Sequence, residues 1–64
     1  MKILIVDDEY YTVEMLSREI DWNIFGITEV IKAYNGKEAL EKILKEKPDI
    51  VICDIEMPQF DGLT

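Results

Sequence analysis

The sequence predicts one α/β domain built on a parallel sheet, with the chain order strand, helix, strand, helix, strand. Residues 3–6 and 50–53 form short, unbroken apolar runs. Such runs are typical of strands that are buried on both faces of a parallel sheet. Between them lie two segments with apolar side chains at helical spacing, separated by a β-branched stretch. This alternation of strands and helices is the pattern of consecutive βαβ units.

The first half of the chain supplies two strands and one helix. We expect the first strand over residues 2–6 and a helix over residues 10–20, where Val13, Leu16 and Ile20 recur at helical spacing. Asp8 is a candidate N-cap for that helix, because its side-chain oxygen can accept a backbone N–H of the first turn. Residues 21–27 read as a loop, and residues 28–34 as the second strand.

The second half supplies the remaining helix and strand. Asn35 and Gly36 form a turn that opens a helix over residues 37–46, with Asn35 as cap or as a left-handed residue. Pro48 ends the helix. The third strand covers residues 49–53 and leads to Asp54, and we expect Cys53 to be a buried structural thiol. The apolar stripe of the helix consists of Ala39, Leu40, Ile43 and Leu44.

Right-handed crossovers restrict how these elements can assemble. With the first strand in the centre, the strand order is 2-1-3 and one helix covers each face. Asp7 and Asp8 follow the first strand and Asp54 follows the third. The carboxyl ends of neighbouring parallel strands share one edge of the sheet, which is where open α/β sheets hold their sites. We therefore expect these three carboxylates to lie together.

Three clustered carboxylates indicate a divalent metal site. They repel one another unless a hard cation joins them, and Mg²⁺ prefers oxygen ligands of this kind. The alternative is that Asp7, Asp8 and Asp54 are ordinary caps and loop residues. That reading would be favoured for any one of them alone, but not for all three directly after apolar strands.

Composition narrows the class of protein further. The chain has 64 residues and a net charge of -7, from 14 acidic and 7 basic residues. This balance argues against contact between this segment and nucleic acid, which would need a basic face. One cysteine and no histidine exclude an internal disulfide and a Cys/His metal site. No apolar stretch approaches the roughly 20 residues that span a membrane, and we expect a cytoplasmic protein.

Several short motifs occur along the chain at definite spacings. They are Ile-Leu-Ile-Val-Asp-Asp-Glu at residues 3–9, Asn35-Gly36 with Glu38-Ala39-Leu40, Pro48-Asp49-Ile50-Val51, Asp54, Met57-Pro58 and Asp61-Gly62. With these motifs the chain resembles, over its whole length, the receiver domain of bacterial two-component response regulators. Residues 20–27 further resemble receivers that precede AraC-type DNA-binding output domains. The resemblance implies a flavodoxin-like fold and a role in phosphorelay signal transduction, as a signalling receiver rather than an enzyme.

The resemblance also implies roles for individual residues. Asp54 matches the phosphoacceptor, which takes a phosphoryl group from a sensor histidine kinase and so controls an output domain. Asp8 and Asp54 match direct Mg²⁺ ligands, and Asp7 matches a ligand that acts through water. Glu56 matches the position whose backbone carbonyl binds the metal.

Residues 1–64 match only the first three strands and two helices of a receiver, a truncated form of the doubly wound order 2-1-3-4-5. The third strand then has an open apolar edge, which invites pairing with another chain. We expect a homodimer or larger oligomer through this edge. Two alternatives remain: a phosphorylation-incompetent association module, and a Mg²⁺-dependent hydrolase with an aspartyl nucleophile, whose Asp-x-Asp pattern Asp54-Ile55-Glu56 fits loosely.

Overall fold

The computed structural model describes residues 1–54 and the side chains of residues 1–53. The elements are β1 (Lys2–Asp7), α1 (Tyr10–Glu19), the 3-10 helix η1 (Trp22–Phe25), β2 (Glu29–Ala33), α2 (Gly36–Glu46) and β3 (Ile50–Asp54). All five predicted strands and helices are present, and no predicted end differs by more than one residue. The segment predicted as a loop contains η1. No helix of the described chain is long and apolar enough to cross a bilayer.

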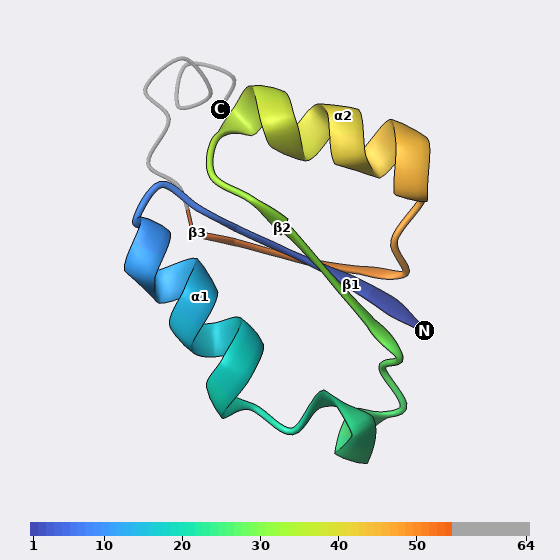
Figure 1. The fold of residues 1–64 in the computed structure, drawn as a ribbon. Coiled ribbons are helices and arrows are strands. Elements are labelled where there is room, and N and C mark those ends of the chain that lie inside the picture. Colours follow the sequence, from blue (N-terminus) through green and yellow to red (C-terminus); the bar gives the residue numbers. More distant parts are fainter. Residues whose placement is uncertain (55–64) are drawn as a thin grey trace.

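The sheet is parallel and has the predicted order β2-β1-β3. Its two helices lie on opposite faces (Figure 1). In the register, Val6 of β1 pairs with Ala33 of β2 and with Cys53 of β3. The register of β3 is fixed at its start, where Asp49 Oδ2 accepts the Lys2 N–H at 2.8 Å and the Asp49 N–H donates to the Lys2 carbonyl at 2.9 Å.

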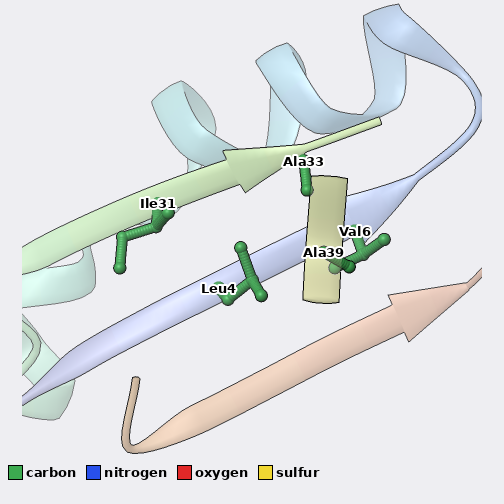
Figure 2. Packing of buried hydrophobic residues seen from close by; sticks show 5 residues of the cluster. All are labelled: Leu4, Val6, Ile31, Ala33 and Ala39. Atoms are coloured by element: carbon green, nitrogen blue, oxygen red, sulfur yellow. The ribbon is translucent and has the colours of Figure 1, made fainter. Parts of the chain in front are cut away.

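The core is centred on β1, whose residues 3–7 are all buried. On the α2 face, side chains from β1, β2 and α2 meet in one apolar cluster, made of Leu4, Val6, Ile31, Ala33 and Ala39 (Figure 2). On the other face, Val13 of α1 is fully buried. Removing an aliphatic side chain of this size from water contributes about 1.5–3 kcal/mol, so the buried side chains of β1 contribute strongly to the stability of the described chain.

A polar and aromatic cluster joins α1 to the end of β2. The Tyr34 hydroxyl donates to Glu14 Oε2 at 2.7 Å, and Lys32 Nζ lies 3.3 Å from both oxygens of the same carboxylate. The Tyr34 ring stacks on Tyr10, with 5.3 Å between ring centroids and 23° between planes. We call Tyr10, Glu14, Lys32 and Tyr34 the α1–β2 clamp.

The start of α2 is capped as the Asn35-Gly36 turn predicts. Asn35 has an extended backbone and its side-chain oxygen accepts the Glu38 N–H at 2.8 Å. Glu38 Oε1 in turn accepts the Tyr34 N–H at 2.9 Å. This reciprocal arrangement satisfies backbone donors that the first helical turn cannot pair internally. It also fixes the backbone of Tyr34, which carries the clamp.

The third strand is much less covered than the sequence suggests. Both helices pack on β1 and β2, and Ile50, Val51 and Ile52 are 36–44% exposed. Cys53 is exposed, so the prediction of a buried thiol is wrong. The cause is its position on an edge strand that neither helix covers. Because α2 packs mainly on β1 and β2 rather than on β3, its apolar stripe is only partly buried. Ala39 is buried, whereas Leu40 and Leu44 are exposed.

The contacts within the clamp shift the pKa values of Glu14 and Tyr34. The hydrogen bond from Tyr34, and then the one from Lys32, hold the pKa of Glu14 below its ordinary value of 4.5. The hydrogen bond to Glu14, followed by desolvation, raises the pKa of Tyr34 from 10.0 to about 12. Both shifts favour one state, a charged Glu14 facing a neutral Tyr34.

We predict that the hydroxyl of Tyr34 ionises at an unusually high pH. Because the folded pKa of Tyr34 lies above its unfolded value of 10.0, the neutral phenol stabilises the folded chain fully below pH 10. This contribution is lost as the pH rises through about 12. An ultraviolet titration of the folded chain should show a step near pH 12 that Tyr34→Phe removes and Glu14→Gln moves toward pH 10. If the step near pH 12 is still present in Tyr34→Phe, the assignment to Tyr34 is contradicted.

Candidate functional site

The predicted site lies at the carboxyl edge of the sheet. Asp7 is the last residue of β1 and Asp54 the last residue of β3, and the two are register partners. Neighbouring strands are about 4.8 Å apart. The parallel sheet therefore brings the backbones of these two residues side by side, although they are 47 positions apart in the chain.

Asp7 is the only buried acidic residue among the described side chains, with 6% of its surface exposed. One of its oxygens, Oδ1, accepts the Glu9 N–H at 2.9 Å. This bond from residue i to residue i+2 is an Asx-type turn. It turns the chain from the end of β1 toward α1 and holds the Asp7 carboxylate in a defined orientation.

Asp8 is exposed and does not cap α1, so that prediction is wrong. The N-cap position is Glu9, which makes no side-chain cap hydrogen bond. Its carbonyl accepts the N–H groups of Thr12 and Val13 at 3.1 and 3.3 Å. The physical reason is the start of the helix at Tyr10, which leaves Asp8 one residue before the N-cap position, in the turn closed by the Asp7 hydrogen bond. The Asp8 carboxylate therefore projects from a turn that does not depend on it.

The donor set of this edge is suited to a hard divalent cation. Asp7 and Asp8 bring two carboxylates to the turn, and carboxylate oxygen is the preferred ligand of Mg²⁺. Among the described side chains no three His, Cys, Asp or Glu residues converge on one point. A complete site would thus depend on Asp54, whose side chain is not described, and on Glu56, which lies outside the described residues.

The α1–β2 clamp lies next to this edge, and sequence reasoning did not identify it. Tyr10 begins α1 immediately after the acidic turn, and Tyr34 follows the last residue of β2. The hydrogen bond between Glu14 and Tyr34 spans 20 positions of the chain. The available signal was a pair of aromatic residues, Tyr10 and Tyr34, that each follow shortly after the carboxyl end of a strand. That pattern by itself does not say that the two rings stack.

Comparison with known proteins gives a consistent result. The response regulator receiver domain family matches residues 3–64. The transcriptional regulatory protein YesN of Bacillus subtilis is 45% identical over 97% of this chain and 17% of its own length. The alkaline phosphatase synthesis transcriptional regulatory protein PhoP of the same organism is 40% identical over 97% of this chain and 25% of its own length. No solved structure matches.

Relatives of a different kind match equally well. A protein-glutamate methylesterase/protein-glutamine glutaminase of Oleidesulfovibrio alaskensis is 45% identical over the whole chain and 17% of its own length. The chain thus spans about a sixth of the length of several relatives that it matches. Receiver domains generally bind Mg²⁺ for phosphorylation and interact with histidine kinases. The family match, the sheet order and the acidic edge agree, and the chain belongs to the response regulator receiver domain family, whose role is phosphorelay signal transduction.

Proposed function

We propose that Asp54 is the phosphoacceptor of this receiver. The observation that carries the proposal is the register between β1 and β3, which sets Asp54 beside Asp7 at the end of the sheet that also bears Asp8. The carboxyl end of a parallel sheet is where open α/β folds hold their sites, and an acidic residue at this position is suited to accept a group delivered from solvent. The family resemblance of the segment around Asp54 supports the same role.

The reaction would be an in-line phosphoryl transfer. A carboxylate oxygen of Asp54 forms a bond to phosphorus while the P–N bond of a phosphohistidine breaks, and the electron pair of that bond remains on the imidazole nitrogen. The product is an acyl phosphate. A carboxylate is a weak nucleophile, so catalysis in such transfers comes mainly from positioning and charge stabilisation.

Asp7, Asp8 and Asp54, with the backbone carbonyl of Glu56, are the residues that would hold Mg²⁺. A bound Mg²⁺ would neutralise negative charge on the transferring phosphoryl oxygens. The family resemblance implies that Asp7 would act through water, and its Oδ1 accepts the Glu9 N–H. Asp8 would bind directly, which fits its exposed side chain and its lack of a capping role.

The proposed partner of this receiver is a sensor histidine kinase. The receiver would also control an output domain that belongs to the same cytoplasmic protein as the receiver itself. YesN and PhoP are named as transcriptional regulatory proteins, which supports transcriptional control, with an AraC-type domain as the specific candidate. Other relatives are named as methylesterases, so the output of the whole protein can differ while the receiver itself acts as a signalling module. The net charge of -7 supports an output domain, rather than this segment, as the part that contacts DNA.

A second proposal concerns association of the 64-residue chain through β3. Its residues Ile50, Val51 and Ile52 are 36–44% exposed, and among the described strands β3 pairs on one side only. An exposed apolar edge strand can pair with an identical strand of another chain. This favours a homodimer or larger oligomer, and it would operate with or without phosphorylation of Asp54.

Phosphorylation should depend on Asp54. After treatment of the chain with acetyl phosphate and Mg²⁺, mass spectrometry should find one phosphoryl group on Asp54, and Asp54→Asn should abolish the label. Asp21→Asn is the matched control. Asp21 follows the opposite end of α1, is exposed, and makes no side-chain cap hydrogen bond at the start of η1. Undiminished labelling of Asp54→Asn would rule out this acceptor.

Magnesium affinity should depend on Asp8. Removal of a direct carboxylate ligand is expected to weaken binding at least tenfold in Asp8→Ala, which corresponds to about 1.4 kcal/mol. Isothermal titration with Mg²⁺ measures the effect, and Asp21→Ala should bind as the wild-type chain does. Wild-type affinity in Asp8→Ala would remove Asp8 from the ligand set.

The association state should depend on the edge of β3. Sedimentation at micromolar concentration should detect a dimer or larger species, which Ile52→Lys shifts toward monomer because a charged side chain on the edge opposes pairing. Ile24→Lys is the control for added charge alone, because Ile24 is an exposed residue of η1. A wild-type chain that sediments as a cooperative monomer would refute association through this edge.

A further inference from the structure

The turn that bears Asp8 is held at both of its ends. On one side is Asp7, which is buried and bonded to the Glu9 N–H at 2.9 Å. On the other side is Tyr10, whose ring stacks on Tyr34 at a centroid distance of 5.3 Å. Asp8 itself is exposed. Its position is therefore determined by these two flanking anchors rather than by packing of its own side chain.

The second anchor is built from residues far apart in the chain. The Tyr34 hydroxyl donates to Glu14 at 2.7 Å, and Glu14 is also paired with Lys32. The backbone of Tyr34 is fixed independently, because its N–H donates to Glu38 at the start of α2. The Tyr34 ring is thus held from its backbone and from its hydroxyl, and it presents a fixed surface to Tyr10.

Tyr10 has little other support. Tyr10 is 58% exposed, and its other aromatic neighbour is Tyr11, which is 81% exposed and meets it edge-on. Stacked aromatic pairs contribute stability beyond the burial of their surface area. This contribution matters for a turn of a few residues, because ordering each backbone residue costs conformational entropy.

We propose that Tyr34 is a positioning residue, which holds the Asp8-bearing turn in place for divalent cation binding through its stack on Tyr10. The inference rests on the proposed function, because it takes Asp8 as a cation ligand. Glu14 and Lys32 act one step further away by holding the Tyr34 ring. Tyr34 does not touch the cation or the reacting atoms.

The first test compares Mg²⁺ affinity in aromatic variants of the 64-residue chain. Tyr34→Leu and Tyr10→Leu each remove the stack and should weaken Mg²⁺ binding by about tenfold, the lower end of the loss typical for groups that orient a ligand. Tyr34→Phe keeps the ring and should recover most of that affinity. Tyr11→Leu, which removes an exposed tyrosine of the same helix, should bind Mg²⁺ as the wild-type chain does.

The dependence of labelling on Mg²⁺ concentration distinguishes a positioning role of Tyr34 from a purely structural one. If Tyr34 acts by positioning Asp8, Tyr34→Leu should need more Mg²⁺ for half-maximal acetyl-phosphate labelling but reach the wild-type rate at saturation. A lowered rate at every Mg²⁺ concentration, or wild-type Mg²⁺ affinity in both leucine variants, would overturn the proposal.

The second test needs no metal and so separates this inference from the proposed function. Amide hydrogen exchange of Glu9, whose N–H is bonded to Asp7, should become faster in Tyr34→Leu and Tyr10→Leu. Exchange of Ala39, bonded to the Asn35 carbonyl, should not change. Failure of the wild-type chain to bind Mg²⁺ would refute Asp8 as a ligand. Unchanged exchange at Glu9 would refute the positioning role itself.

Discussion

The parallel pairing of β3 with β1 is the constraint on which the site depends. Side chains alternate between the faces of a strand, so a slip of one residue would move every side chain of β3 to the opposite face. The register is set at its beginning by the two hydrogen bonds between Lys2 and Asp49. Its consequence at the other end of the strands is the pairing of Asp7 with Asp54.

The same sheet explains both what is stable and what is exposed in this chain. β1 is buried on both faces and paired on both edges, and it collects the contacts of the two helices. β3 is joined to the sheet only through β1 among the described elements, and its side chains remain partly in water. A strand in this position contributes its backbone to the site while its apolar surface stays available to other chain segments. The proposed phosphoacceptor and the proposed association surface therefore lie on the same strand.

Local sequence signals predicted most of the fold because they reflect local physics. Unbroken apolar runs marked β1 and β3, and the Asn35-Gly36 turn marked the cap that the structure contains. Two predictions failed for identifiable reasons. Asp8 was expected to cap α1, but the helix begins at Tyr10, so the N-cap position falls on Glu9. Cys53 was expected to be buried, but burial depends on a neighbouring element that covers β3, and neither helix does so.

The site itself could be predicted only in part. Its acidic residues follow from strand ends and topology, and the register between Asp7 and Asp54 agrees with that prediction. The roles of Asp54 and Glu56 as phosphoacceptor and metal ligand remain predictions. The α1–β2 clamp was missed because it joins Tyr10 and Glu14 to Lys32 and Tyr34. Contacts over such a sequence separation depend on the packing of α1 against β2, which no local pattern contains.

The most direct test of this account measures the register between β1 and β3 with a disulfide. Val6 and Cys53 are register partners, and adjacent strands bring Cα atoms within the roughly 4.4–6.8 Å that a disulfide requires. In dilute solution, oxidised Val6→Cys should form an intramolecular bond to Cys53, identified by mass spectrometry of the unreduced digest. Ile5→Cys, on the opposite face of β1, should not. A bond from Ile5→Cys in place of Val6→Cys would show a shifted register and would separate Asp7 from Asp54.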